Sequence, residues 1–125
     1  MIENSNLVVD NKQDNICFIN SLDDYKNIIK GKNIINVLIF IAEWCGPCKR
    51  IKPLIKESIL KYKKNKNMKT IRFIYVNIDK CLPLTEHLNI SLLPTIIIRE
   101  NNKEFFRLLN KNTETLNDCI DNLLT

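Results

Sequence analysis

Two cysteines separated by two residues have the clearest capacity for chemistry in this chain. Cys45 and Cys48 belong to the segment WCGPC, which begins at Trp44. The apolar run Ile34–Ile41 before it predicts a buried strand, and the residues after it have helical spacing. Cys45 is therefore expected at the N-terminus of a helix, where unpaired N–H groups stabilise a thiolate. Such a position lowers a thiol pKa from about 8.5 into the range of about 3.5–7.5.

The residues between the cysteines suit a tight turn into that helix. Gly46 allows the chain to approach closely, and Pro47 presets the φ angle of the first helical turn. Cys48 then lies one turn after Cys45 on the same side. Two thiols held in this way can attack a disulfide and release it again, so the pattern beside a strand and a helix predicts thiol–disulfide exchange.

Two other uses of such a pair remain open. A structural zinc site normally needs four ligands, and the chain offers no second closely spaced pair, only the isolated Cys81 and His87. A structural disulfide without turnover is the second alternative. The five cysteines include only one closely spaced pair, which differs from the even sets of secreted disulfide-rich domains.

Hydrophobic periodicity predicts an α/β fold with the element order β-α-β-α-β-α-β-β-α. The helix after Ser21 is expected to end at Gly31, and Asn101 with Asn102 is expected to form a hairpin turn. The last helix carries Leu116, Ile120 and Leu123. The predicted strands are 16–19, 34–41, 71–78, 95–98 and 105–109, with a short helix over 84–88 between the third and fourth.

A chain of 125 residues is long enough for one domain and too short for two. Residues 1–14 are polar and aperiodic and are predicted to be a flexible extension, with the domain over 15–125. The longest apolar run, Val37–Ala42, is too short to cross a membrane, and the N-terminus has no secretory pattern. We therefore expect a cytoplasmic protein that does not bind membranes.

The segment AEWCGPCK, Ala42–Lys49, resembles the active-site signature of the thioredoxin family. Pro53 and the segments Val76–Asp79 and Leu93–Thr95 match further landmarks of that family in order and spacing. The resemblance extends over about residues 16–124. It implies a thioredoxin-like fold, in which a central mixed β-sheet is flanked by helices.

The resemblance also implies an activity, the reduction of disulfides in client proteins. Cys45 would attack the client, Cys48 would resolve the mixed disulfide, and Pro94 would follow a cis peptide bond. The residues implied to bind the client are Trp44, Gly46, Pro47, Leu93 and Pro94. A flavoprotein disulfide reductase using NADPH would re-reduce the pair, and the chain would be a monomer with no bound cofactor or metal.

Several positions depart from the family pattern, among them Ile41 in place of a second tryptophan and Leu92 and Asn110 in place of glycines. Ile39 stands where the family usually has an aspartate beneath the resolving cysteine, and Tyr75 stands where a lysine often accompanies it. These changes suggest a second hypothesis, a non-enzymatic interaction module that kept the fold but turns over weakly. A third, an oxidising or isomerising domain of a secretory compartment, is disfavoured by the Gly-Pro pair between the cysteines.

Outside the motif, Cys17 and Cys119 lie within apolar patterns and are expected to be inert core thiols. Cys81 follows a predicted strand whose end should face the redox pair. We expect it to be an inert surface thiol, with a role in redox chemistry as the alternative. His87 is expected to be solvated.

The segment 49–72 is strongly basic, with ten Lys or Arg and a single acid, Glu57. A solvated helix face explains this pattern without any function. Steering of acidic client proteins is the functional alternative, and it would be sensitive to salt. Nucleic acid binding is not expected, because Tyr62 is the only aromatic residue on the helical part of this segment.

Overall fold

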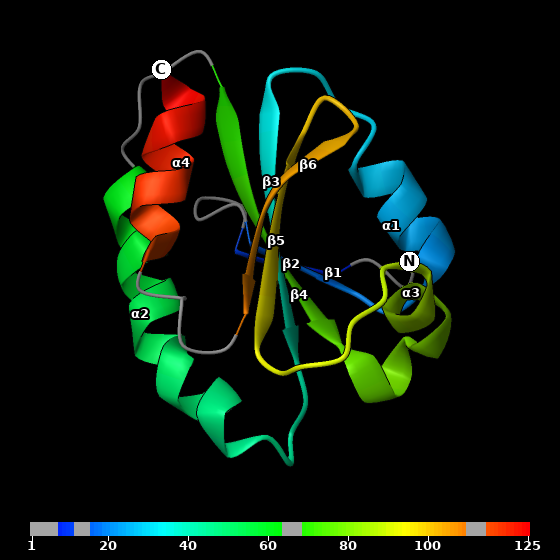
Figure 1. The fold of residues 1–125 in the computed structure, drawn as a ribbon. Helices are drawn as coiled ribbons and strands as arrows, with labels where there is room; N and C mark the ends of the chain where they lie inside the picture. The colour runs from blue at the N-terminus through cyan, green and yellow to red at the C-terminus, as the bar shows by residue number, and fades with distance from the viewer. Residues whose placement is uncertain (1–7, 12–15, 64–68, 110–114) are drawn as a thin grey trace.

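The computed structural model describes residues 8–11, 16–63, 69–109 and 115–125. A six-stranded sheet with the order β1-β2-β4-β3-β5-β6 forms its centre (Figure 1). β2 and β3 both pair with β4 in parallel, whereas β1, β5 and β6 pair antiparallel with their neighbours. The strands are β1 (Val8–Asn11), β2 (Ile16–Ile19), β3 (Ile34–Ile41), β4 (Thr70–Asn77), β5 (Thr95–Glu100) and β6 (Lys103–Leu109).

Helices cover both faces of this sheet, so the predicted thioredoxin-like architecture is confirmed. α2 (Gly46–Lys63) and α4 (Leu116–Leu124) lie on one face, and α1 (Leu22–Ile28) and α3 (Leu82–His87) lie on the other (Figure 1). β3 is the central strand, and its side chains alternate between two apolar clusters. Val37 packs with the α2 and α4 side, whereas Phe40 packs with the α1 and α3 side.

One strand was not predicted. β1 pairs antiparallel with β2, with Val8 opposite Phe18. The prediction of a flexible extension is therefore wrong for residues 8–11, and the rest of 1–14 lies outside the described residues. The physical reason is that the backbone N–H and C=O groups of β2 on this side need partners, and two adjacent valines favour an extended chain. Four residues are too few for a periodicity to be detected.

The first helix begins as predicted and ends earlier. The Ser21 side chain caps it by accepting a hydrogen bond from the Asp24 backbone N–H at 3.0 Å. The helix ends at Ile28, and Gly31 does not adopt a positive φ. Asn33 takes the left-handed conformation instead, with φ 57°, just before β3. In the β5–β6 hairpin, Asn101 and Asn102 adopt the expected left-handed conformations, with φ 51° and 68°.

Hydrogen bonds between polar side chains connect α2 to α4 beside the apolar cluster to which both helices contribute. The Tyr62 hydroxyl donates to Asp121 Oδ1 at 2.6 Å, and the Ser58 hydroxyl donates to Asn117 Oδ1 at 2.6 Å. Burial and the Asp121 carboxylate both raise the pKa of the Tyr62 phenol, so it stays protonated and remains a donor. These bonds hold the C-terminal helix against the helix that carries the cysteine pair.

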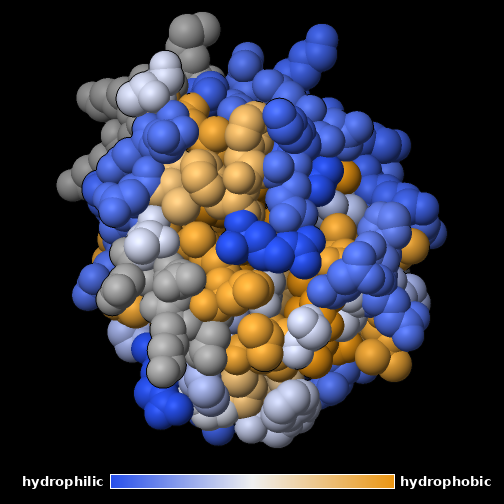
Figure 2. All heavy atoms as spheres, viewed as in Figure 1, coloured by the Kyte–Doolittle hydropathy of each residue, from blue (hydrophilic) through white to orange (hydrophobic). Residues whose placement is uncertain are grey.

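The surface toward the viewer in Figure 2 has an apolar area in its middle, over the part of the sheet where β5 and β6 lie in Figure 1. β6 is an outer strand of the sheet, and its Phe105 and Leu109 are 42% and 41% exposed. Hydrophilic residues cross the middle of this area, and the apolar surface continues below them (Figure 2). No helix in the described part of the chain has the length and apolar character needed to cross a bilayer.

Candidate redox site

The cysteine pair lies where the central strand turns into the long helix. The chain leaves β3 at Ile41, and the Cys45 backbone N–H donates to the Ala42 carbonyl at 3.2 Å. α2 begins at the next residue, Gly46, so Cys45 lies at the helix N-terminus as the sequence predicts. The pair therefore follows a strand that is hydrogen-bonded to a neighbouring strand on each side along almost its whole length.

The two cysteines are joined by a disulfide bond, with their Cα atoms 5.3 Å apart. The Cys48 backbone N–H also donates to Cys45 Sγ at 3.2 Å. This bond points a helix N-terminal donor at the sulfur of Cys45, which is the arrangement that favours a thiolate there after reduction. Both residues are buried, with 5% of Cys45 and 1% of Cys48 exposed.

A groove of about 420 Å³ leads to the disulfide from one side. Its lining includes Cys45 but not Cys48. Of the two cysteines, Cys45 is therefore the one that borders this groove. The lining residues are Trp44, Cys45, Gly46, Pro47, Ile78, Ile90, Ser91, Leu92 and Leu93.

The groove brings together four of the five residues expected to bind a client: Trp44, Gly46, Pro47 and Leu93. The fifth, Pro94, is buried and does not line the groove, and the peptide bond that joins it to Leu93 is cis, as the resemblance implies. Ile90 and Ser91 also line the groove and were not singled out from the sequence. They lie between a short helix and β5, where no pattern in the residue types marks them.

An aspartate missed as a site residue positions the tryptophan. Trp44 is 68% exposed, yet its indole Nε1–H donates to Asp79 Oδ2 at 2.8 Å. Asp79 belongs to the 3-10 helix η2 (Ile78–Lys80) after β4, and its own backbone N–H donates to the Asn77 side chain at 3.0 Å. This turn explains why β4 ends one residue before the predicted strand. The hydrogen bond fixes a large apolar surface at the rim of the groove.

Comparisons with known proteins agree with this geometry. The family model described as Thioredoxin matches residues 17–122. Thioredoxin 1 of Plasmodium falciparum is 33% identical over 103 residues, which are 82% of this chain and 92% of that protein. The chain belongs to the thioredoxin family.

Solved structures of thioredoxins have the same fold. A Plasmodium falciparum thioredoxin superposes with a TM-score of 0.71 at 32% identity, covering 84% of this chain and 96% of that one. A Trypanosoma brucei brucei thioredoxin superposes with a TM-score of 0.80 over 94% of this chain and 97% of that one, at 22% identity. Family membership and the bonded cysteine pair together make this thioredoxin-family protein a thiol–disulfide oxidoreductase.

The close approach of the chain that the sequence suggested at Gly46, within the thioredoxin motif, is not found. A Cβ atom placed there would meet nothing closer than the Arg50 guanidinium, at 4.0 Å. The close approach inferred for Gly46 from the sequence is therefore absent in this state. Gly46 instead leaves the groove open beside Cys45, where a side chain would occupy the space.

The two departures from the thioredoxin pattern at Ile39 and Tyr75 fall in different environments. Ile39 is fully buried on β3, in the apolar cluster with Ile51 and Ile55 of α2. Tyr75 lies beside Ile39 on the neighbouring strand β4 but is only partly buried. Its ring stacks on that of Phe18, with the ring centroids 5.3 Å apart. Ile39 thus belongs to the apolar cluster under α2, whereas the cluster that contains the cysteine pair packs against Ile41, Ile78 and Leu93.

The prediction of a surface location for Cys81 is wrong. Its side chain is fully buried in the cluster that also contains Leu84 and Tyr25, because the chain turns inward from η2 to start α3. Burial raises the pKa of the Cys81 thiol. Cys17 and Cys119 are buried as predicted, and burial raises the pKa of both thiols. His87 is exposed, as expected, and its ring makes an edge contact with Tyr25.

We expect the native oxidised protein to expose no reactive thiol. Burial both blocks access to Cys17, Cys81 and Cys119 and disfavours their thiolates. Ellman's reagent should therefore titrate no thiol rapidly in the native protein and three after unfolding. Non-reducing gels after mild oxidation should show the same absence of dimer for wild type and for Cys81→Ser. A dimer that Cys81→Ser abolishes would contradict this assignment.

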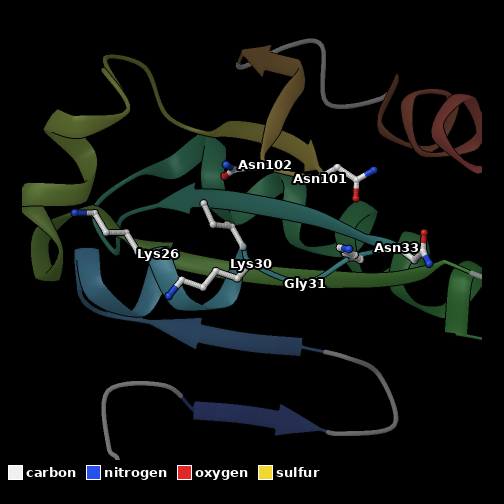
Figure 3. A pocket seen from close by; sticks show the side chains of 8 residues that line it. Lys26, Lys30, Gly31, Asn33, Asn101 and Asn102 are labelled. Atoms are coloured by element: carbon white, nitrogen blue, oxygen red, sulfur yellow. The ribbon is translucent and has the colours of Figure 1, made fainter.

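Two other observations delimit the site. Among the described residues, no three His, Cys, Asp or Glu side chains come together in a way that could hold a metal ion. A hollow of about 670 Å³ lies elsewhere, lined by Lys26 and Lys30 from α1 and its end and by Asn101 and Asn102 from the β5–β6 turn (Figure 3). It also includes Asn33, just before β3, so it is at the opposite end of that strand from the disulfide.

Proposed function

We propose that this chain reduces disulfides in client proteins, with Cys45 as the attacking thiol and Cys48 as the resolving thiol. The observation that carries the assignment is the unequal access of the two sulfurs: the groove beside Trp44 reaches Cys45 and does not include Cys48. A client strand lying in this groove would contact Trp44, Gly46, Pro47 and Leu93, with the buried Pro94 next to Leu93 in the chain.

Reduction of the client proceeds in two displacements. The Cys45 thiolate attacks one sulfur of the client disulfide, and the other client sulfur leaves and takes up a proton. The Cys48 thiolate then attacks Cys45 Sγ, which forms the Cys45–Cys48 disulfide and releases the second client thiol. Two electrons pass from the dithiol to the client, and a flavoprotein disulfide reductase restores the dithiol.

Several further properties belong to this proposal. The protein works as a monomer in the cytoplasm, without a bound cofactor or metal, and it does not bind nucleic acids. The mitochondrial thioredoxin-2 of Schizosaccharomyces pombe, 28% identical over 102 residues, illustrates that relatives occur in other compartments. The exposed lysines of α2 are positioned to attract acidic clients at low salt.

The second candidate is an interaction module with weak turnover. The buried Ile39 favours it, because this side chain cannot exchange a proton with Cys48. The two candidates are separated by the midpoint potential of the Cys45–Cys48 pair and by the rate at which the reduced protein cleaves a protein disulfide.

We expect a potential near about −270 mV, which is typical of thioredoxins, together with catalytic turnover when a thioredoxin reductase and NADPH are supplied. A stably folded protein without turnover would select the interaction module. A potential near about −180 mV would indicate an isomerase-like protein instead.

A further inference from the structure

A second opening at the cysteine pair is separate from the groove beside Trp44. It is a recess of about 290 Å³, and its lining includes Cys48 but not Cys45. Its volume is large enough for several water molecules. The lining residues are Ile41, Ala42, Glu43, Cys48, Lys49, Lys52 and Asn77. The two cysteines thus line separate openings, Cys45 the groove beside Trp44 and the almost fully buried Cys48 this smaller recess.

The charged residues of the recess differ in their relation to Cys48. Lys52 follows Cys48 by four residues in α2, so the two side chains lie on the same helix face with Cβ atoms about 5–6 Å apart. Lys49 directly follows Cys48 in α2, so its side chain is rotated by about 100° about the helix axis relative to that of Cys48. Glu43 precedes the pair and contributes a negative charge at the mouth of the recess.

Among the described residues, the other elements that line the recess contribute no charged side chain. β3 contributes Ile41 to the recess, and the end of β4 contributes the neutral amide of Asn77. Ile78 and Leu93 pack against the cluster that contains Cys48. Asp79 accepts the hydrogen bond from Trp44 on the client side. The phenol of Tyr75 lines the neighbouring groove and not this recess.

We propose that Lys52 stabilises the thiolate of Cys48 across this recess, and that water in the recess takes the Cys48 proton. This inference rests on the proposed function, because it concerns the resolving step. Resolution requires Cys48 to lose its proton before it attacks Cys45 Sγ, breaks the bond to the client sulfur and forms the intramolecular disulfide. The residues packed against the pair are apolar, so the exposed Lys52 supplies favourable electrostatics from the solvent side.

The signs of the charges make the proposal specific. A positive charge at Lys52 favours the thiolate, and a negative charge at Glu43 opposes it. Neutralising these two residues should therefore shift the rate of resolution in opposite directions. Lys56 provides a matched control, because it lies one turn further along α2 and lines only the neighbouring groove.

The experiment follows the reaction of the reduced protein with Ellman's reagent by stopped flow between pH 6 and 9.5. Attack by Cys45 releases one equivalent of thionitrobenzoate, and resolution by Cys48 releases the second. For Lys52→Gln we expect the second release to be about threefold slower at pH 7 and its pH midpoint to move upward, with Lys52→Arg close to wild type. Glu43→Gln should be faster than wild type, and Lys56→Gln should match it.

Different results would contradict the role of Lys52 and the assignment of Cys48 as the resolving thiol. Equal pH profiles for Lys52→Gln and Lys56→Gln would overturn the role of Lys52, as would a slower second release in Glu43→Gln. The Cys48→Ser variant should release only the first equivalent. Release of both equivalents by that variant would instead overturn the assignment of Cys48 as the resolving thiol.

Discussion

Replacing Cys48 by serine is expected to convert the protein into a trap for its clients. Cys45 can still attack a client disulfide in this variant, but no second thiol is placed to release the product. Mixed disulfides with client proteins should therefore accumulate and disappear on treatment with dithiothreitol. Replacing Cys45 by serine should instead reduce disulfide cleavage to background and remove alkylation at neutral pH, because the remaining thiols are buried.

The two variants are matched controls for each other, since each keeps one cysteine of the pair and loses the same disulfide. Mass spectrometry of trapped adducts from a defined disulfide substrate, together with alkylation rates, gives the readout. Adducts on Cys45→Ser and none on Cys48→Ser would reverse the assignment. Such a result would also mean that a client reaches Cys48 through the recess beside Lys52.

Replacing Ile39 by aspartate is expected to destabilise the fold and to accelerate resolution at neutral pH. A carboxyl group at this fully buried position should cost on the order of 1–3 kcal/mol of unfolding free energy or more. Burial should also raise its pKa from about 3.9 toward neutrality. Because the folded state then binds the proton more tightly than the unfolded state, stability should fall as the pH rises from about 4 to the raised pKa.

The gain in rate has a different pH dependence. A base beneath Cys48 can accept its proton, so resolution by Ile39→Asp should exceed the wild-type rate at pH 7. The advantage should fade toward pH 9, where the thiol ionises readily without a base. Rapid-mixing kinetics across this range provide the test, with Ile39→Asn as a polar control of similar size. An unchanged or slower step in a folded Ile39→Asp variant would contradict the expectation.

Much of the fold follows from local patterns in the sequence. The predicted strand Ile34–Ile41 is confirmed residue for residue, because a continuous run of apolar and β-branched side chains is stable only when both faces are covered. The turn at Asn101 and Asn102 is also confirmed, since asparagine tolerates a positive φ. In these places a local preference and the tertiary environment agree.

The features that could not be predicted depend on partners distant in the sequence. β1 is specified by its pairing with β2 rather than by a pattern of its own. The burial of Cys81 depends on the direction in which the chain leaves η2. The hydrogen bond from Trp44 to Asp79 joins residues 35 positions apart, and only the resemblance to a family landmark singled out the segment that contains Asp79.

The position of the disulfide at the end of β3 has a consequence for how the molecule moves. β3 is flanked by β4 on one side and β5 on the other, so opening it would break two ladders of hydrogen bonds at once. Local fluctuations of a native protein begin where few such bonds must break, which here means the outer strands β1 and β6. The redox pair is thus attached to a part of the molecule that opens only in rare, large-scale unfolding events. Electron transfer can proceed at the first turn of α2 while the framework beneath it stays still.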